Sequence, residues 1–406
     1  MRTFRPTTAG DLLEAVQEAL ADATTLEIVG GGTKRDLGRP FQSSGRLELA
    51  GLTGITLYEP GELVLSALAG TPLKEIEQAL KEQRQELAFE PPDLGPLFGM
   101  DEGKQTIGGV VAGNLAGPRR IKAGAARDHF LGFHAVSGRG EAFKSGGRVM
   151  KNVTGYDLSK LMAGSWGTLA VLGDVTLKVL PAAEKTRTVL VLGLDPVRAV
   201  AAMTAALTGP HDVSGAAHLP QGLARLSSVS YVQGSGKSVT ALRLEGPPAS
   251  VEHRCTELTK ALAPFGAVEE LHSMNSGKLW REIRDVRFLV EPQERAVWRI
   301  SVPPQSGAAV AAAISRSLDA PMYFDWGGGL IWLSVPKEIA DASASTIRAA
   351  VGEVGHATLY RAPADLRASV PVFQPQAPDL AALTSRVKDS FDPKRILNPG
   401  RMYAGV

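Results

Sequence analysis

The sequence of 406 residues predicts an α+β protein with two domains, and three observations support this. Between residues 28 and 173, glycine repeatedly interrupts short apolar runs, which is typical of strands joined by tight turns. Residues 183–370 read instead as two successive sets of strands and amphipathic helices, each in the order β-α-β-β-α-β. Residues 371–406 hold a helical pattern and a turn-rich stretch, with no strand partner in the second domain. We therefore expect this segment to return to the first domain, residues 1–182.

The first domain is expected to alternate helices and short strands. Thr7 and Thr8 precede residues with helical apolar spacing, as hydroxyls that cap a helix do. Leu26 to Val29 form an apolar run that ends in three glycines, which predicts a strand and a glycine turn. Further along we expect strands at 63–68, 169–172 and 175–180, and helices at 72–80 and 157–162.

The second domain is expected to hold a duplicated split βαβ, or ferredoxin-like, pattern. The repeat rests on the order of the elements, because the two sets share no visible sequence identity. The first set comprises 189–192, 196–207, 213–217, 240–244, 249–262 and 268–271, and the second comprises 297–302, 307–318, 322–326, 330–335, 338–354 and 357–361. A helix over 276–289 lies between them, and the C-terminal segment begins with a helix over 380–391.

Composition excludes several classes of protein. The 44 basic and 42 acidic residues leave a net charge of +2, which argues against nucleic-acid binding. The lone cysteine, Cys255, excludes an intrachain disulfide and any all-cysteine metal or iron–sulfur site within this chain. No apolar signal region and no apolar run of about 20 residues is present. We expect a soluble, cytoplasmic protein that reaches a membrane only through partners.

The motif Gly30-Gly31-Gly32-Thr33-Lys34 follows a predicted strand. Consecutive glycines let successive backbone N–H groups form a concavity that suits a diphosphate, and Lys34 could add positive charge. A side chain at Gly31 is expected to occupy the diphosphate space. The motif is neither a Rossmann fingerprint nor a Walker A loop, and taken alone a plain tight turn is its commoner interpretation.

Two further stretches are rich in small residues. Residues 106–114, which include Gly108, Gly109, Gly113 and Asn114, permit a flat ligand or another chain segment to approach the backbone closely. Close packing of a helix on a strand is the alternative. Residues 151–169 contain the other glycine-punctuated stretch. Three such elements in one domain favour a large nucleotide ligand over three unrelated turns.

Other polar clusters favour structural interpretations. The basic run at 119–122, together with Arg127, is expected to form a solvated face rather than a binding patch. His129 and His134 have no carboxylate or cysteine at ligand spacing, so we expect no metal site. Arg284 and Arg287 lie on one side of a helix and could bind a substrate carboxylate, although structural ion pairs are the commoner explanation.

Read in order, these motifs carry a family resemblance. Gly-Gly-Gly-Thr is followed by Pro91-Pro92-Asp93, Thr106-Ile107-Gly108-Gly109, Gly113-Asn114, Arg127-Asp128, Gly155-Tyr156-Asp157-Leu158, Gly164-Ser165, Gly167-Thr168-Leu169 and Leu397-Asn398-Pro399-Gly400. This series resembles the FAD-binding oxidoreductases of the vanillyl-alcohol oxidase and p-cresol methylhydroxylase (PCMH) type. Within that family, the stretch 148–157 looks most like the FAD-binding subunits of bacterial glycolate oxidases.

The resemblance implies a PCMH-type FAD domain of two α+β subdomains and a ferredoxin-like cap. It also implies FAD held non-covalently, because Thr33 stands where covalent members carry a histidine. The residues that it places around FAD are Gly30, Gly31, Gly32, Thr33, Lys34, Pro91, Thr106, Gly108, Gly109, Gly113, Asn114, Gly167, Thr168, Val171 and Asn398.

Two departures from the family pattern bear on catalysis. The His-x-Gly-Asp-Gly-Asn-x-His motif of catalytic 2-hydroxyacid relatives does not occur in 183–370, so no catalytic residue is assigned. Trp166 stands where the family usually carries an acidic residue, and Ala170 replaces a glycine.

The implied function is that of an FAD-binding oxidoreductase subunit in a glycolate (2-hydroxyacid) oxidase or dehydrogenase complex. Glycolate would be oxidised to glyoxylate, and electrons would leave through the flavin to a partner. The expected partners are a second flavoprotein subunit and an iron–sulfur subunit. Two alternatives stay open: a non-catalytic flavin-bearing assembly subunit, and a free-standing FAD oxidoreductase with another substrate, such as a sugar or a peptidoglycan precursor.

One helix pattern predicts a partner-binding surface. Trp280, Arg284 and Phe288 share a helical stripe at i, i+4 and i+8, and an arginine in such a stripe suits a core poorly. Trp298, Trp326 and Trp332 lie in predicted strands, where filling the cap core is the better explanation.

Overall fold

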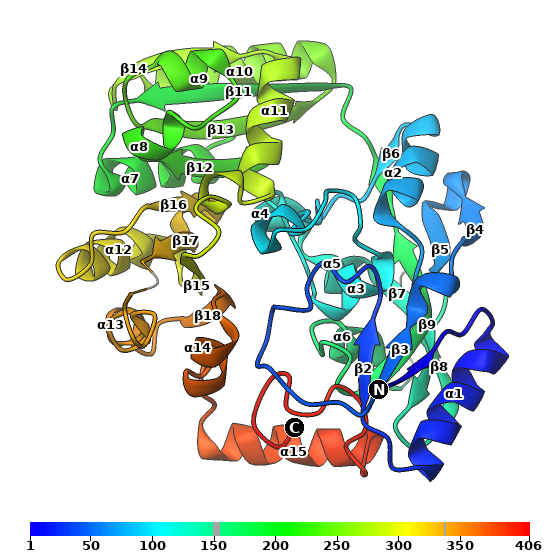
Figure 1. The fold of residues 1–406 in the computed structure, drawn as a ribbon. Helices are drawn as coiled ribbons and strands as arrows, with labels where there is room; N and C mark the ends of the chain where they lie inside the picture. Colours follow the sequence, from blue (N-terminus) through cyan, green and yellow to red (C-terminus); the bar gives the residue numbers. More distant parts are fainter. Residues whose placement is uncertain (149–154, 337) are drawn as a thin grey trace. The chain divides into compact units, whose positions relative to one another are not determined.

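The computed structural model describes residues 1–148, 155–336 and 338–406, which form two compact units (Figure 1). The first, here called the glycine-rich unit, comprises Met1–Ala116, Gly124–Ala182 and Pro371–Val406. The second, the cap unit, comprises Ala183–Val370 together with the excursion Gly117–Ala123. Within the part of the chain that is described, no helix combines the length and apolar character needed to cross a bilayer.

The glycine-rich unit begins with a three-stranded parallel sheet in the order β1 (Arg2–Phe4), β3 (Gly45–Glu48), β2 (Leu26–Val29). Helix α1 (Ala9–Ala21) starts at Thr8, whose hydroxyl accepts the Asp11 N–H while Asp11 accepts the Thr8 N–H. This reciprocal pair is a capping box, as the two threonines predicted. The apolar face of α1 packs with β2 and β3 into one core.

A five-stranded antiparallel sheet forms the second layer of this unit, and strand β9 pairs at its centre. Its order is β4 (Ile55–Glu59), β5 (Val64–Leu68), β9 (Ala170–Lys178), β7 (Phe130–Ser137), β8 (Ala142–Gly146). The sequence suggested two strands where the structure has β9 alone. The ladder with β7 is irregular beside His134, and this irregularity accommodates Gly173 without ending the strand. The helices of the layer are α2 (Leu73–Glu82), α3 (Ile107–Ala112), α5 (Ala126–His129) and α6 (Leu158–Met162).

The C-terminal segment belongs to the glycine-rich unit. Helix α15 (Pro378–Phe391) leads into a turn, after which Leu397 lies beside Leu26 as a parallel bridge. Leu26 N–H donates to the Ile396 carbonyl at 2.6 Å, and Asn398 N–H donates to the Leu26 carbonyl at 3.0 Å. Residues about 370 positions apart in sequence therefore share one edge of the parallel sheet.

The cap unit holds an eight-stranded sheet whose described ladders are all antiparallel. Its order is β14 (Ala267–Leu271), β11 (Lys185–Leu192), β13 (Val239–Gly246), β12 (Gly215–Leu219), β16 (Met322–Asp325), β17 (Leu330–Val335), β15 (Ala296–Ser301), β18 (His356–Arg361). Numbered within its own half, each set follows the order 4-1-3-2, and the halves meet where β12 pairs with β16 at His218 and Phe324. The α+β fold with a duplicated ferredoxin-like cap is confirmed.

The cap helices occupy the expected places with shifted ends. They are α7 (Pro196–Thr208), α10 (Pro248–Leu262), α12 (Gly307–Ser315) and α13 (Ala344–Val351). The last was expected to begin at 338, but Asp341 accepts the N–H groups of Ser343 and Ser345 and holds the preceding residues in turns. Lys337 lies outside the described residues.

The predicted partner-binding stripe is wrong. Helix α11 (Ser273–Arg284) ends before a separate short 3-10 helix (Arg287–Leu289), so the stripe is not continuous. Trp280 and Phe288 are each only 3% exposed, and Trp280 donates its indole N–H to Thr188. Arg284 pairs with Asp285, with Nε 2.8 Å from Oδ1. Each ring packs on the cap sheet: Trp280 against Thr188 of β11, and Phe288 against Tyr323 of β16.

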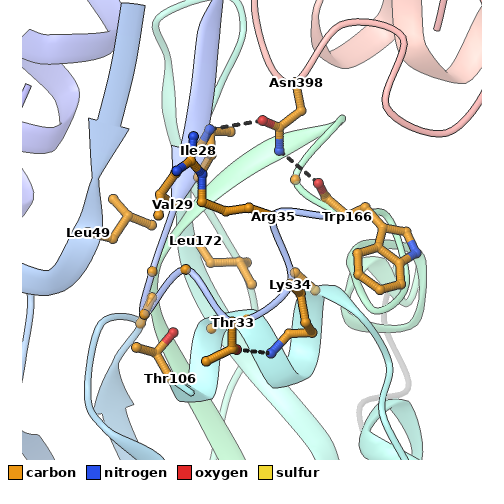
Figure 2. A pocket seen from close by; sticks show the side chains of 18 of the residues that line it. Ile28, Val29, Thr33, Lys34, Arg35, Leu49, Thr106, Trp166, Leu172 and Asn398 are labelled. Atoms are coloured by element: carbon orange, nitrogen blue, oxygen red, sulfur yellow. Dashed lines mark hydrogen bonds between the residues drawn. The ribbon is translucent and has the colours of Figure 1, made fainter. Parts of the chain in front are cut away.

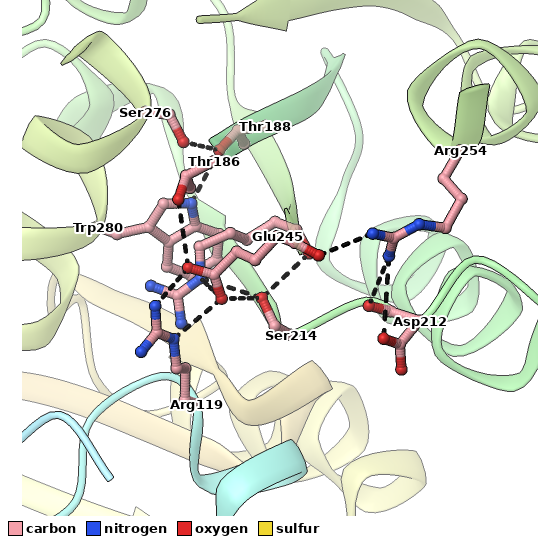
Figure 3. A network of polar contacts seen from close by, with 10 residues as sticks. Arg119, Thr186, Thr188, Asp212, Ser214, Glu245, Arg254, Ser276 and Trp280 are labelled. Carbon is pink, nitrogen blue, oxygen red and sulfur yellow. Dashed lines mark hydrogen bonds and ion pairs between the residues drawn. The ribbon is translucent and has the colours of Figure 1, made fainter. Parts of the chain in front are cut away.

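The basic run at 119–122 is not a uniform solvated face either. Arg119 donates from Nε to Glu245 Oε2 at 2.9 Å, and its side chain is largely buried (Figure 3). Figure 3 shows Glu245 at the centre of a polar network in the first half of the cap, with Ser214 and Thr186 as further partners. Burial opposes ionisation of Glu245, but Arg243 and Arg119 outweigh it and lower its pKa to about 2.

Candidate FAD-binding site

A pocket of about 710 Å³, its open mouth included, lies within the glycine-rich unit (Figure 2). The loop after β2, the start of α3, the turn before β9 and the C-terminal segment all contribute to its lining. Four segments that are distant in the sequence therefore converge on one cavity.

Most of the sequence-predicted site residues line this pocket. They are Gly30, Gly31, Gly32, Thr33, Lys34, Thr106, Gly108, Gly109, Gly167 and Asn398. Pro91, Gly113, Asn114, Thr168 and Val171 are not among the lining residues. Ala112, from the small-residue stretch 106–114, also lines it, and sequence reasoning did not single out several others: Ile28, Val29, Arg35, Leu49, Ala69, Leu172 and Arg401.

The glycines of the loop after β2 serve different purposes. A Cβ at Gly31 would lie 1.6 Å from the Lys104 carbonyl oxygen, so Gly31 is needed because the loop runs against another backbone segment. The expectation that its side chain would intrude on a ligand is therefore wrong. Gly32 has φ +77°, a conformation that favours glycine. A Cβ at Gly32 would have space, because its nearest neighbour would be the Arg35 side chain at 3.8 Å.

The loop also presents free backbone donors. Arg35 N–H donates to the Gly32 carbonyl at 3.2 Å, and Leu37 N–H donates to the Lys34 carbonyl at 3.2 Å. The N–H groups of residues 31–34 donate to no residue in the described part of the chain. Successive free N–H groups in a turn form an anion-binding concavity.

Lys34 is a buried cation beside these donors. It is 8% exposed, and its Nζ donates to Thr33 Oγ1 at 3.1 Å (Figure 2). No carboxylate among the described residues forms an ion pair with it. Burial lowers the pKa of Lys34 to about 8, with only partial compensation from the charge of Asp93. A buried ammonium without an anion is costly, and a bound anionic group would relieve that cost.

Helix α3 contributes two glycines that differ in role. A Cβ at Gly108 would lie 2.7 Å from both the Cβ and the carbonyl oxygen of Ala69, which is the close-packing interpretation of this motif. A Cβ at Gly109 would meet only Thr106 Oγ1 at 3.4 Å and the end of Lys34 at 3.7 Å. Gly109 therefore keeps the space next to the Lys34 ammonium open.

Asn398 connects the two sides of the pocket. Its Oδ1 accepts the Ile28 N–H at 2.9 Å and its Nδ2 donates to the Trp166 carbonyl at 2.8 Å (Figure 2). Trp166, 9% exposed, takes a positive φ of 55° and is one of the lining residues. A cation, Arg401, lies over the Trp166 ring at 5.6 Å and donates from Nη2 to the Lys34 carbonyl at 2.7 Å.

A buried ion pair holds Asn398 in place. Lys388, fully buried, donates from Nζ to Asp392 Oδ2 at 2.8 Å and to the Thr168 and Leu397 carbonyls at 2.6 and 2.9 Å. Asp392 also accepts the N–H groups of Ile396 and Leu397. This arrangement fixes the turn that carries Asn398.

Three of the predicted residues outside the lining make contacts next to the pocket. Asn114 adopts φ +46° and accepts the Arg127 N–H on Oδ1 at 3.0 Å. A Cβ at Gly113 would lie 3.3 Å from the Trp166 ring. Thr168 Oγ1 donates to the Ser165 carbonyl at 2.7 Å. The stretch 149–154, part of the resemblance noted in the sequence, lies outside the described residues.

Known proteins resemble this chain in sequence. Residues 2–146 match the family described as FAD binding domain. The chain is 34% identical over 393 residues to glycolate oxidase subunit GlcE of Escherichia coli strain K12, covering 97% of each chain.

Solved structures agree in fold. 4-Ethylphenol oxidase from Gulosibacter chungangensis superposes with TM-score 0.73 at 15% identity, covering 99% of this chain and 89% of that chain. p-Cresol methylhydroxylase superposes with TM-score 0.70 at 14% identity, covering 99% and 88%. The chain belongs to the PCMH-type FAD-binding oxidoreductases, and within them to the group of glycolate oxidase subunit GlcE.

Proposed function

We propose that this chain is the FAD-binding subunit of a glycolate, or 2-hydroxyacid, oxidase complex. The observation that carries the proposal is the similarity to subunit GlcE along nearly the whole of both chains. The expected partners are a second flavoprotein subunit and an iron–sulfur subunit, because this chain has only one cysteine and cannot ligate a cluster by itself.

FAD is the cofactor, and the residues of the pocket fit it. The free N–H groups of residues 31–34 and the buried Lys34 ammonium would hold the diphosphate, which supplies the anion that this cradle lacks. Thr33 offers no imidazole for a covalent bond, so we propose non-covalent binding. When bound, FAD supplies a two-electron acceptor: oxidation of a 2-hydroxy acid removes a hydride from C2 and a proton from the hydroxyl group.

A second candidate is a flavin-bearing subunit whose partner performs the substrate chemistry. Among the described residues that line the pocket there is no histidine, aspartate or glutamate. Proton removal from a hydroxyl group ordinarily uses such a side chain as general base. This observation favours a partner, or another part of this chain, as the source of the base.

The first test is cofactor binding. Acid precipitation of the purified chain should release yellow flavin into the supernatant, and a colourless protein that ignores added FAD would contradict the proposal. A yellow pellet with a colourless supernatant would instead indicate covalent attachment.

The second test separates the two functions. The FAD-loaded chain is mixed anaerobically with glycolate or D-lactate, alone and with a co-expressed second flavoprotein. Loss of flavin absorbance in the isolated chain supports the catalytic subunit. Reduction only after the partner is added supports the flavin-bearing assembly subunit, and no reduction of either preparation contradicts both.

A further inference from the structure

Each half of the cap holds an arginine of the sheet that lies over a tryptophan ring, and the two arginines differ in their polar partners. In the first half, Arg243 lies over the Trp280 ring at 4.6 Å and pairs with Glu245, with Nε 3.4 Å from Oε2. Glu245 also pairs with Arg119 (Figure 3). The positive charges of this half therefore have a buried carboxylate among them.

Arg299 lies in the corresponding ladder of the second half, but on the first strand of that half (β15), whereas Arg243 lies on the third strand of its half (β13). In the β11–β13 ladder Arg243 is opposite Thr188, and in the β15–β17 ladder Arg299 is opposite Trp332. Its guanidinium lies over the Trp326 ring at 4.9 Å and the Tyr360 ring at 5.9 Å. Across the residues that the structure describes, Arg299 forms no hydrogen bond and no ion pair.

A second cation adds to the positive potential here. Arg120 lies over the Trp326 ring at 4.9 Å, so two guanidinium groups share one indole. Burial lowers the pKa of His356, and the charges of Arg299 and Arg120 lower it further. The adjacent carboxylate, Asp325, accepts the Trp326 N–H on Oδ1 at 2.7 Å.

We propose that Arg299, with Arg120 as a second positive charge, binds the carboxylate of a small 2-hydroxy acid or its 2-oxo product. This inference rests on the proposed function for the identity of the ligand. Aromatic contacts restrain the guanidinium plane while its N–H groups stay available, and that edge matches a carboxylate with two parallel hydrogen bonds. A half-buried cation whose donors are unused gains most from such a partner.

The residue differs from the arginines that the sequence suggested for this purpose. Arg284 already has a carboxylate in Asp285. Arg299 escaped attention because a single arginine in a strand carries no pattern, and only the folded sheet shows that aromatic rings lie beside it and that it forms no ion pair among the described residues.

Calorimetric titration of the FAD-loaded full chain with glycolate and with oxalate tests the proposal. Arg299→Gln should weaken binding about 10- to 100-fold, the effect of losing a charge-assisted bidentate pair. Arg299→Lys keeps the charge without the fork and should fall between Gln and the natural residue. The matched control is Arg316→Gln, an exposed arginine of the same half of the cap, which should bind both ligands normally.

Tryptophan fluorescence supplies an independent signal. Trp326 and Trp332 neighbour Arg299, so ligand binding should change the emission of the natural chain and not that of Arg299→Gln. Equal binding by Arg299→Gln and the natural chain would overturn the proposal, as would no binding by the natural chain or equally tight, Arg299-dependent binding of inorganic phosphate.

The outcome is separable from that of the proposed function. If the assembled complex oxidises glycolate and Arg299→Gln leaves KM unchanged, the carboxylate site is wrong and the function stands. If the complex does not oxidise glycolate but oxalate binds in an Arg299-dependent manner, the site stands and the function is wrong.

Discussion

Lys34 and Lys388 are two buried lysines of the glycine-rich unit with opposite surroundings. Lys388 has a carboxylate one helical turn away and two carbonyl oxygens within hydrogen-bond distance. Lys34 has one hydroxyl group and no carboxylate partner in the described part of the chain. Burial lowers the pKa of both; at Lys388 the charge and the hydrogen bond of Asp392 oppose this effect, and at Lys34 only the charge of Asp93 does. Lys388 is complete without a ligand, and Lys34 is not.

The difference indicates that Lys388 has a structural role and Lys34 a ligand-binding role. A buried ion pair that is fully hydrogen-bonded fixes one conformation of the chain, here the turn that carries Asn398. A buried cation that faces a pocket beside free N–H groups stores an unfavourable interaction that an anion removes.

The largest effect, on the free energy of unfolding, is expected at the ion pair of Lys388 and Asp392. Asp392→Ala leaves the Lys388 ammonium buried without its carboxylate and removes the acceptor for two backbone N–H groups. The free energy of unfolding should fall by about 3–5 kcal/mol, measured by urea denaturation. Asp389→Ala, which removes an exposed partner of Arg395, is the control and should cost about 0–1 kcal/mol.

A double substitution sharpens this test. Lys388→Met with Asp392→Leu removes both charges at once, so no buried ion is left uncompensated. The double variant should lower the free energy of unfolding by less than Asp392→Ala alone does. A double variant that is as unstable as the single one would mean that the hydrogen bonds of Asp392 to the turn, and not its charge, stabilise the tail.

The sequence was informative where function depends on local motifs. The loop at residues 30–34, the small residues of α3 and Asn398 were all identified from short patterns, and the structure brings them to one pocket. Arg401 and Lys388 were not, because their roles arise from the return of the C-terminal segment. Trp280 and Phe288 were misread because periodicity defines a face without saying what covers it.

At Lys34 we expect a smaller effect on stability and a clear effect on ligand binding. Lys34→Met removes a buried charge that has no ion pair, so the unfolding free energy of the FAD-free chain should change by no more than about 1 kcal/mol. FAD affinity should fall roughly 10- to 100-fold, because the charge-assisted contact to the diphosphate is lost.

Fluorescence titration of FAD measures this change. Lys104→Met, an exposed lysine on the segment that packs against the same loop, is the matched control and should keep the natural affinity. Unchanged FAD affinity in Lys34→Met would place the diphosphate elsewhere.

The smallest effect is a dependence of FAD affinity on pH. The pKa of Lys34 is about 8 in the ligand-free chain, because burial disfavours its charge. A bound diphosphate favours the ammonium form and raises that pKa. The binding contribution of Lys34 is therefore fully present below pH 8 and is lost as the pH rises from 8 towards the higher pKa of the bound state. Affinity should fall by up to about tenfold between pH 7 and 9, since one proton is taken up on binding in that range.

A variant that lacks the titrating group supplies the control for this pH effect. Lys34→Met should bind FAD weakly and with a flat profile between pH 7 and 9, because the group that takes up the proton is gone. A chain in which the natural residue and Lys34→Met show the same slope would assign the proton to another group. A flat profile in the natural chain would mean that Lys34 stays charged without FAD, and thus that its surroundings stabilise the ammonium as well as those of Lys388 do.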